Sequence, residues 1–404
     1  MVRARAAAFA IVAAAMLTPA ISAPTKAASP ELTKALGQAL AAQDIDPRRT
    51  AALAVDLRTG EVVFRTNPSL ALMPASAEKL AVSFAALGVL GPDFRFRTEV
   101  VGAGARQGGT WEGNLVVVGH GDPTLVIADL DRLARQIAKR GIRHVEGRVL
   151  GDESHFDARR DAPGWKQSYL GIESRPLSAL SVVDLPVRSP NGSAAIAAHA
   201  LTAALRRRGV TVSGPPGAGR AATSAMPLAR DASEPLRVLV RRMNRDSDNY
   251  VAETVLKALG STIAPHGSTA AGAFVVREEL AAAEIPLRGV RIADGSGLSG
   301  LDRLTAEALV AILRAGASDP SMRDVFVTSL AVAGISGTME KRLVRRPTRS
   351  RVIAKTGTTN AASSLAGFVR RQYVFAVIQN GSPVPYWSAR AAQDRFVTVL
   401  ARSG

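Results

Sequence analysis

Leu72-Met73-Pro74-Ala75-Ser76-Ala77-Glu78-Lys79 is the stretch of the chain from which its fold can be worked out. Apolar residues at helical spacing follow it and predict a helix over Ala75–Leu90, which ends before Gly91-Pro92. Ser76 and Lys79 then lie on one helix face, with Cβ atoms about 5–6 Å apart. A serine hydroxyl is a poor nucleophile until a base takes its proton, and a lysine can do so when burial or a neighbouring cation lowers its pKa. The pair therefore predicts a serine nucleophile with its own base.

A second polar motif, Ser247-Asp248-Asn249, precedes a segment of helical pattern that starts at Tyr250. In isolation such a triplet is a polar turn or a helix N-cap. Beside an activated serine it has a more specific use, because Ser247 can relay a proton to a leaving group and Asn249 can hydrogen-bond a substrate amide. We expect Asp248 to support the loop rather than to act on substrate.

A third motif, Lys355-Thr356-Gly357, closes the apolar run Val352–Thr356, which is predicted to be a strand that faces a cleft. The lysine supplies a cation, and Thr356 and Thr358 supply hydroxyls, a set that suits a carboxylate. The glycine lets a ligand backbone approach closely. Each motif alone is common by chance. All three in this order form the signature of class A β-lactamases and penicillin-binding proteins, which are serine acyl-transfer enzymes.

Helical and strand-like patterns lie toward both ends of the chain, whereas the middle of the chain has a different texture. The predicted helices of the two flanks are Pro30–Leu40, Leu236–Leu259, Thr269–Ala283, Thr305–Ala315 and Ser388–Ala401. The predicted strands are Ala51–Leu57, Glu61–Arg65, Val352–Thr356, Ser364–Val369 and Val374–Gln379. In the middle, short strand-like runs punctuated by glycine and proline alternate with helix-like stretches. We therefore predict an α/β fold in which residues 29–92 and 231–404 form one domain, interrupted by a smaller inserted α+β domain of residues 93–230.

The N-terminus carries Arg3 and Arg5, then the apolar run Ala6–Leu17, and then Pro19 with small residues after it. This pattern predicts a secretory signal peptide over residues 1–28, and hence a protein exported to the periplasm or to the extracellular cell-wall space. An anchoring helix or a buried core helix is the alternative, but the apolar run is short for a bilayer.

The composition excludes several classes of site. The chain has no cysteine, so it has no thiol nucleophile, no thiolate metal site and no disulfide. Its five histidines lack the spacing of metal ligands, and we expect neither a metal nor another cofactor. The net charge of +17 comes with scattered arginines and no nucleic-acid motif, so nucleic acid is not an expected partner. We expect the charge instead to favour association with an anionic cell envelope.

On these motifs the chain resembles D-alanyl-D-alanine carboxypeptidases/endopeptidases of the penicillin-binding protein 4 type, the low-molecular-mass class C penicillin-binding proteins. The resemblance runs from about Pro30 to the C-terminus. Further segments that carry it are Leu90–Phe96, Gly121–Leu125, Gly151–Asp157, Asp294–Ser299 and Val332–Thr338. The resemblance implies a β-lactamase/transpeptidase-like domain, which combines an antiparallel sheet flanked by helices with a helical subdomain.

The resemblance also implies an exported serine enzyme that acts on the D-alanyl-D-alanine end of peptidoglycan stem peptides and is inhibited by β-lactams. Ser76 would form the acyl-enzyme and Lys79 would be the base, while Ser247 with Lys355 would complete the proton network. Backbone N–H groups of Ser76 and Thr358 would form the oxyanion hole. The residues implied in substrate binding are Asn249, Lys355, Thr356, Gly357 and Thr358.

Two features depart from the family's pattern. The inserted region is shorter than usual, because Ser181–Leu185 runs almost directly into the helix-like stretch Ala194–Arg208. Acidic residues often follow the family's Pro-Gly-Trp segment and help to bind the free amine of a diamino-acid side chain. Here Pro163-Gly164-Trp165 is followed by Lys166-Gln167-Ser168-Tyr169, and Glu173 is the residue that could substitute for them.

Two other functions compete with a carboxypeptidase/endopeptidase. A β-lactamase must deacylate fast, which class A enzymes assist with a glutamate on a loop. The sequence has no Glu-x-x-Leu-Asn pattern between the first two motifs, and its long insertion also argues against this function. A non-catalytic envelope-binding protein with the same fold is the second alternative, against which the intact set of three motifs argues.

Overall fold

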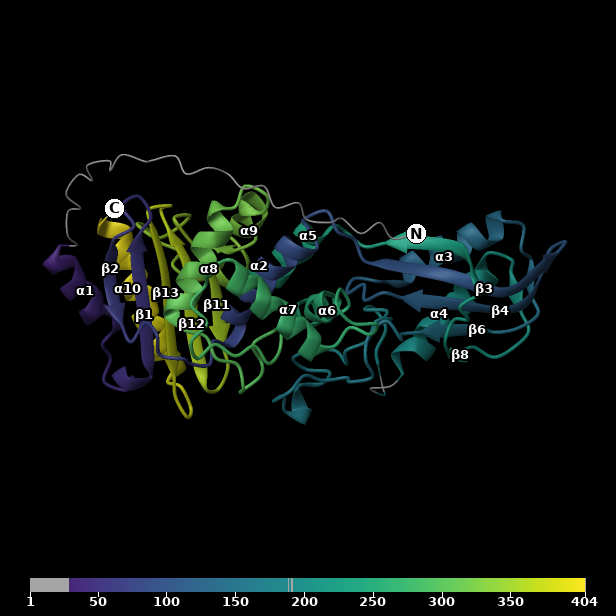
Figure 1. The fold of residues 1–404 in the computed structure, drawn as a ribbon, viewed down its shortest axis with the longest axis horizontal. Coiled ribbons are helices and arrows are strands. Elements are labelled where there is room, and N and C mark those ends of the chain that lie inside the picture. Colours follow the sequence, from purple (N-terminus) through teal and green to yellow (C-terminus); the bar gives the residue numbers. More distant parts are fainter. Residues whose placement is uncertain (1–28, 188, 190–191, 404) are drawn as a thin grey trace, which may run out of the picture.

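A computed structural model describes residues 29–187, 189 and 192–403 of the chain. The predicted signal peptide, residues 1–28, lies outside the described residues. The molecule is elongated, with one sheet toward each end and a group of helices between the two sheets (Figure 1). In the part of the chain that the structure describes, no helix has both the length and the apolar character needed to cross a membrane.

Six antiparallel strands form the first sheet, in the order β10-β11-β12-β13-β1-β2. Their bounds are β1 Thr50–Asp56, β2 Val62–Thr66, β10 Ala331–Val332, β11 Val352–Thr358, β12 Ala362–Val369 and β13 Tyr373–Asn380. The early strand β1 pairs with β13 along its whole length, for example Leu53 with Ala376. The two flanks of the chain therefore close one sheet.

Helices cover both faces of this sheet, which explains why β13 is a continuous apolar run rather than an alternating one. Helices α1 (Pro30–Leu40) and α10 (Tyr386–Ser403) lie on one face, where Leu36, Phe375 and Phe396 share a core. Helix α8 (Ala306–Ser318) lies on the other face and shares a core with Ile378 (Figure 1). Helix α1 has the predicted bounds, because Ser29 caps it and Pro30 occupies its first position.

The central group of helices carries two of the three sequence motifs. It contains η2 (Ala75–Glu78), α2 (Lys79–Val89), α5 (Leu236–Arg245), α6 (Asn249–Gly260), α7 (Thr269–Ala282), α8 and α9 (Arg323–Thr328). Helix α2 is apolar on nearly all sides and is buried accordingly, whereas α6 is buried although it carries charged residues. The periodicity over Leu236–Leu259 resolves into two helices, because Ser247 adopts a left-handed backbone with φ 64° that ends the first of them. Short 3-10 turns lie at η1 (Pro47–Arg49), η3 (Gln167–Tyr169) and η4 (Gly337–Met339).

A second sheet lies at the other end of the molecule and has a core of its own (Figure 1). Its strands are β3 Arg97–Gln107, β4 Thr110–Gly119, β5 His144–Val145, β6 Val149–Asp152, β7 Thr211–Val212, β8 Gly217–Ala218 and β9 Met226–Ala232. Helices α3 (Ile127–Lys139) and α4 (Ser193–Arg207) pack against it. The first strand pairs with the last, Thr98 beside Asp231, so the chain enters and leaves this unit at one place. The predicted fold class, an α/β domain with a smaller α+β insertion, is confirmed.

Candidate active site

Ser76 lies in a tight turn rather than in the α-helix predicted from Ala75 onward. The 3-10 turn Ala75–Glu78 comes first, and α2 begins at Lys79. In a 3-10 turn the side chains of residues i and i+3 are eclipsed, which places the Lys79 amine 2.9 Å from Ser76 Oγ. Ala75 has a positive φ of 48°, an unusual conformation for alanine. Gly297 packs so closely against the Ala75 carbonyl that a Cβ atom there would overlap it, so contacts from elsewhere in the chain hold this turn.

The Lys79 amine is fully buried and has three oxygen partners. It lies 2.9 Å from Ser76 Oγ, 2.8 Å from Asn249 Oδ1 and 2.5 Å from the carbonyl oxygen of Ser296. Burial lowers the pKa of Lys79 to about 8, although the nearby carboxyl groups of Asp294 and Glu253 favour its charged form. A buried lysine with this pKa can exchange a proton with the serine hydroxyl near neutral pH.

Ser247 and Lys355 form a second pair. The left-handed backbone of Ser247 presents its hydroxyl to the Lys355 amine, 2.9 Å away, and the same amine donates to the carbonyl oxygen of Thr356 at 2.8 Å. Burial in the first place, and the charge of Lys79 in the second, hold the pKa of Lys355 well below its usual value. The two lysines are thus close enough for each to disfavour the charge of the other.

The two residues after Ser247 have different surroundings. Asp248 caps α6 by accepting from the Val251 N–H at 3.0 Å, and its other oxygen accepts from Arg242 Nε at 2.7 Å. This agrees with the loop-supporting role predicted for it. The amide oxygen of Asn249 accepts from the Lys79 amine, and its Nδ2 donates to the Glu173 carbonyl at 2.9 Å. Asn249 therefore links the lysine to a loop of the inserted region.

Strand β11 brings the third motif beside Ser76. The short strand β10 pairs only with Ile353 and Ala354, so among the described residues no strand covers that edge of β11 beyond Ala354. The Thr356 hydroxyl contacts that of Thr338 at 2.8 Å. A Cβ atom at Gly357 would come within 3.0 Å of Ser76 N, so this glycine packs directly against the turn that carries Ser76.

Thr358, at the end of β11, opens onto a cavity of about 430 Å³. The cavity lies between this strand end and a loop of the inserted region that supplies Lys166, Tyr169 and Glu173. It is contiguous with the described site, because the Glu173 backbone also receives the Asn249 amide. All three sequence motifs and the predicted Glu173 therefore meet at one place.

The Asp294–Ser299 loop is also part of the site, and the three motifs did not predict its role there. Asp294 is fully buried and accepts hydrogen bonds from four donors. The donors are Ser296 Oγ (3.1 Å), Gly297 N (2.7 Å), Ser299 N (2.8 Å) and Trp165 Nε1 (2.7 Å). An acidic residue followed by two glycines, Asp-Gly-Ser-Gly, is the sequence signal of a tight loop built around a carboxylate.

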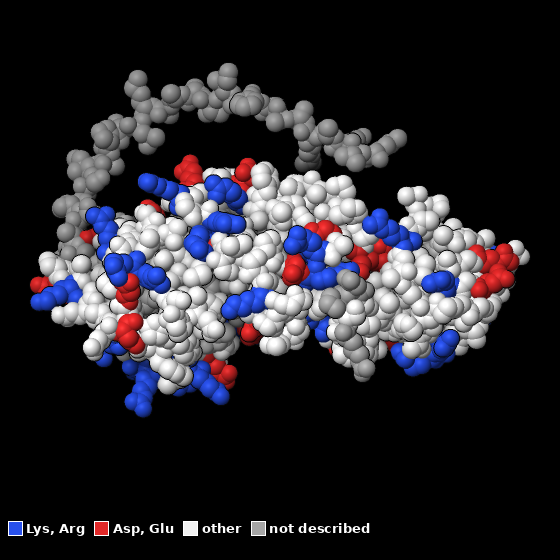
Figure 2. Space-filling model, turned by 90° about the horizontal axis from the view of Figure 1, so that it is seen from below, with Lys and Arg blue, Asp and Glu red and all other residues white. Residues whose placement is uncertain are grey.

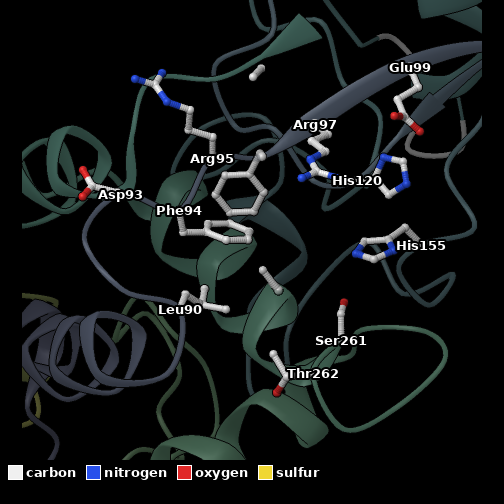
Figure 3. A pocket seen from close by; sticks show the side chains of 13 residues that line it. Leu90, Asp93, Phe94, Arg95, Arg97, Glu99, His120, His155, Ser261 and Thr262 are labelled. Carbon is white, nitrogen blue, oxygen red and sulfur yellow. The ribbon is translucent and has the colours of Figure 1, made fainter. Parts of the chain in front are cut away.

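A larger cavity, of about 700 Å³, lies at the other end of α2 (Figure 3). Leu90, just past the end of this helix, lines it, so along the helix axis it is about 16 Å from the turn that carries Ser76. His120 and His155 lie there with ring centroids 5.0 Å apart, and burial lowers the pKa of His155 to about 4. The cavity contains none of the three motifs.

On the side of the molecule that Figure 2 shows, lysine and arginine side chains are spread along the molecule and interspersed with acidic side chains. Among the described residues, no group of three or more His, Asp or Glu side chains is arranged to hold a metal ion.

Comparisons with known protein families, sequences and solved structures all find carboxypeptidases or penicillin-binding proteins. The model of a family described as "D-Ala-D-Ala carboxypeptidase 3 (S13) family" matches residues 32–184 and 183–403. The chain is 29% identical to a D-alanyl-D-alanine carboxypeptidase of Actinomadura sp. (strain R39), over 86% of this chain and 80% of that protein. It is 30% identical to the carboxypeptidase DacB of Mycolicibacterium smegmatis, over 86% and 79% of the two chains. Penicillin-binding protein 4 of Haemophilus influenzae has a similar fold, with a TM-score of 0.81, 22% identity, and coverage of 92% of this chain and 98% of that one.

Proposed function

The chain belongs to the D-Ala-D-Ala carboxypeptidase 3 (S13) family, and on this premise we propose that it is an exported serine carboxypeptidase/endopeptidase of peptidoglycan stem peptides. The family and the class of enzyme that the sequence predicts are confirmed by this match. The observation that carries the mechanism is the 2.9 Å contact between Ser76 Oγ and the buried amine of Lys79.

In the acylation step the neutral amine of Lys79 takes the Ser76 proton, and Oγ attacks the carbonyl carbon of the penultimate D-alanine. Backbone N–H groups of Ser76 and Thr358 stabilise the charge that develops on the carbonyl oxygen, a contribution of about 3–4 kcal/mol per donor in other enzymes. The proton taken up by Lys79 reaches the leaving amine through the hydroxyl of Ser247, which Lys355 holds, so that Lys79 is neutral again when the amine leaves. Water then cleaves the acyl-enzyme along the same proton path.

The remaining motif residues bind the end of the substrate. The cation of Lys355 and the hydroxyls of Thr356 and Thr358 hold the terminal carboxylate. Gly357 keeps the strand close to the nucleophile and free of a side chain that would obstruct the peptide. Asn249 has two amide hydrogens, of which one is donated to the Glu173 carbonyl, so the other remains for a substrate amide.

The cavity beyond Thr358 is the site for the side chain of the stem peptide. Lys166 and Glu173 give it one charge of each sign, which suits a side chain that ends in an amine and a carboxylate. Glu173 would receive the amine, in place of the acidic residues that often follow the Pro-Gly-Trp segment. Carboxypeptidase and endopeptidase activity share the attacked carbonyl and differ only in the leaving amine.

β-Lactams should acylate Ser76 as mimics of the D-alanyl-D-alanine end. The solved penicillin-binding protein 4 of Haemophilus influenzae that this fold resembles has also been described in complex with a novel β-lactam. Family membership argues against a β-lactamase, and the intact Ser76–Lys79 and Ser247–Lys355 pairs argue against a non-catalytic protein.

We also propose the domain limits and the location that the sequence predicts. Residues 1–28 are a signal peptide, residues 29–92 and 231–404 form the peptidase domain, and residues 93–230 form the insertion. The net charge of +17 supports a long-range electrostatic association of the exported enzyme with anionic envelope polymers.

Covalent labelling by a fluorescent penicillin tests the nucleophile. Ser76→Ala should abolish labelling, whereas Ser69→Ala, which replaces an exposed serine bonded to Glu307, should label like the wild type. Labelling of the Ser76→Ala protein would refute the assignment. Incubation with a pentapeptide and with a cross-linked muropeptide dimer then separates the two peptidase activities. Rapid repeated turnover of penicillin would instead favour the β-lactamase.

A further inference from the structure

Four buried carboxyl groups lie close to Lys79 or to one another beside it, and the proposed mechanism uses none of them. They belong to Glu78, Glu253, Asp294 and Asp302, and all four side chains are buried. Asp294 is saturated with hydrogen bonds, as described above. Both oxygens of Glu78 and one oxygen each of Glu253 and Asp302 have no hydrogen-bond partner among the described residues. Burying a carboxyl oxygen without a hydrogen-bond partner lowers the stability of the fold, so each such group calls for an explanation.

Glu253 is connected to Lys79 by a short path. Its Oε1 accepts from the backbone N–H of Gly295 at 2.9 Å and from that of Ser296 at 2.7 Å. The carbonyl oxygen of Ser296 in turn accepts from the Lys79 amine at 2.5 Å. Glu253 follows Asn249 by four residues on α6, so the two side chains lie one turn apart on the same helix face. One helix therefore positions both fixed acceptors of the lysine: Asn249 directly, and the Ser296 carbonyl through Glu253.

The number of acceptors has a consequence for a lysine that acts as a base. A neutral amine has two N–H bonds and one lone pair. If both N–H bonds are directed to Asn249 Oδ1 and to the Ser296 carbonyl, the lone pair is left for the third partner, which is the Ser76 hydroxyl. Rotation of the amine that would turn the lone pair away from Ser76 is then prevented.

We propose that Glu253 is a positioning residue for the acyl transfer: it fixes the Ser296 carbonyl so that the lone pair of the Lys79 amine faces the Ser76 hydroxyl. The inference rests on the proposed function, in which Lys79 is the base that activates Ser76. Glu253 itself touches no substrate.

The charges around the lysine are consistent with this role. The charged groups that face Lys79 are Glu78 beside it, Asp248 and Glu253 from α6 and its cap, Asp294 from the loop, and Lys355 from β11. Burial, together with the charge of Asp294, raises the pKa of Glu253 to about 8, and burial raises that of Glu78 well above its usual value. At neutral pH a protonated Glu253 keeps Oε1 as an acceptor without adding a negative charge that would hold Lys79 as an ammonium ion.

Two variants of Glu253 separate this role from general stability. Glu253→Gln keeps an acceptor oxygen for the two N–H groups, whereas Glu253→Ala removes it. Thr254→Val is the matched control, because Thr254 is the next residue on α6, is equally buried, and bonds only within the helix, to the Tyr250 carbonyl. The measurements are the second-order rate of acylation by fluorescent penicillin from pH 6 to 9, and the urea midpoint of each protein.

We expect Glu253→Ala to acylate about 100-fold more slowly, Glu253→Gln to remain within about threefold of the wild type at its optimum pH, and Thr254→Val to match the wild type. Glu253→Gln should also leave the acidic limb of the pH profile in place, because the carboxyl group that it replaces is protonated and uncharged below its pKa of about 8. A Gln variant whose limb moves to lower pH, which would show that Glu253 acts through its charge, or a folded Ala variant that acylates at the wild-type rate, would overturn the inference. If the Ala variant does not fold, the position of the acidic limb in the pH profile of the Gln variant is the measurement that tests the inference. Absence of labelling in the wild type would instead overturn the proposed function itself.

Discussion

Gly357→Ala is the substitution whose effect on the site can be worked out most directly from the structure. The backbone of Gly357 is not in the left-handed region, so alanine brings no conformational strain and the effect is steric. The added Cβ would overlap Ser364 Oγ and would lie 2.7 Å from the Pro74 carbonyl and 3.0 Å from Ser76 N. The strand and the turn that carries the nucleophile must therefore move apart.

The magnitude follows from two contributions. Forcing a methyl group into this packed contact costs about 1–3 kcal/mol. Ser364 Oγ donates to the Pro74 carbonyl at 2.6 Å, and loss of this bond costs about 0.5–1.5 kcal/mol more. We expect a decrease of about 2–4 kcal/mol in the free energy of unfolding. Acylation should slow about 100-fold, because Ser76 N, a proposed oxyanion donor, is displaced from its position.

Urea unfolding and the rate of penicillin labelling, measured on the same preparation, test both numbers. Gly300→Ala is the control, because a Cβ at Gly300 meets nothing within 4 Å and should change neither quantity. A Gly357→Ala protein that is destabilised but labels at the wild-type rate would show that Ser76 is not held by this strand. That result would refute the role given to Gly357.

Two further predictions concern buried lysines. Because Lys79 must be neutral to act as the base and its pKa is about 8, the wild-type acylation rate should rise about tenfold per pH unit below pH 8 and level off above it; a flat profile from pH 6 to 8 would contradict this. Asp157→Asn should lower the free energy of unfolding by about 1–3 kcal/mol, because the Lys257 amine, 1% exposed, would lose the negative charge of its carboxylate partner and keep neutral acceptors such as the Arg159 carbonyl at 2.9 Å. Urea unfolding at pH 7 measures it, and a change below about 0.5 kcal/mol would show that this pair is effectively solvated.

The helix and strand patterns of the two flanks, with the family resemblance, were sufficient to predict the fold class, and the local motifs predicted residues that meet at the site. Each motif is a few residues long and lies in a setting that the sequence shows, such as a helix start, a turn before a helix or the end of an apolar strand. Ser29-Pro30 likewise marks the start of α1, because cap chemistry acts within one turn.

The backbone of the two reactive serine turns could not be predicted in the same way. Ala75 and Ser247 both have positive φ, although neither residue type favours it. The conformation at Ala75 depends on Gly297, more than 200 positions later, which packs against its carbonyl. A sequence pattern over one window therefore predicts a continuous helix from Ala75, whereas the tertiary contact holds a 3-10 turn there and the α-helix begins at Lys79.

The burial of charged side chains was the second feature that the sequence did not predict. A glutamate or lysine in a helix is expected to reach solvent, yet Glu253 and Lys257 are fully buried on α6. The local pattern gave no signal for this, because Glu253, Thr254 and Lys257 share one side of α6, as on a helix with a solvent face. The two side chains are buried because distant segments cover that side, with the Ser296 backbone bonded to Glu253 and the Asp157 carboxylate bonded to Lys257.

The two active-site lysines show how such burial shapes the chemistry. Both are buried, but carboxyl groups face Lys79, whereas the partners of Lys355 among the described residues are the Ser247 hydroxyl, the Thr356 carbonyl and the charge of Lys79. Lys355 therefore lacks the negative charge that would stabilise its ammonium form. In the proposed complex the substrate's terminal carboxylate supplies it. Substrate binding would thus give Lys355 the counter-charge that its ammonium form lacks, whereas the carboxyl groups that face Lys79 already favour the charged form there.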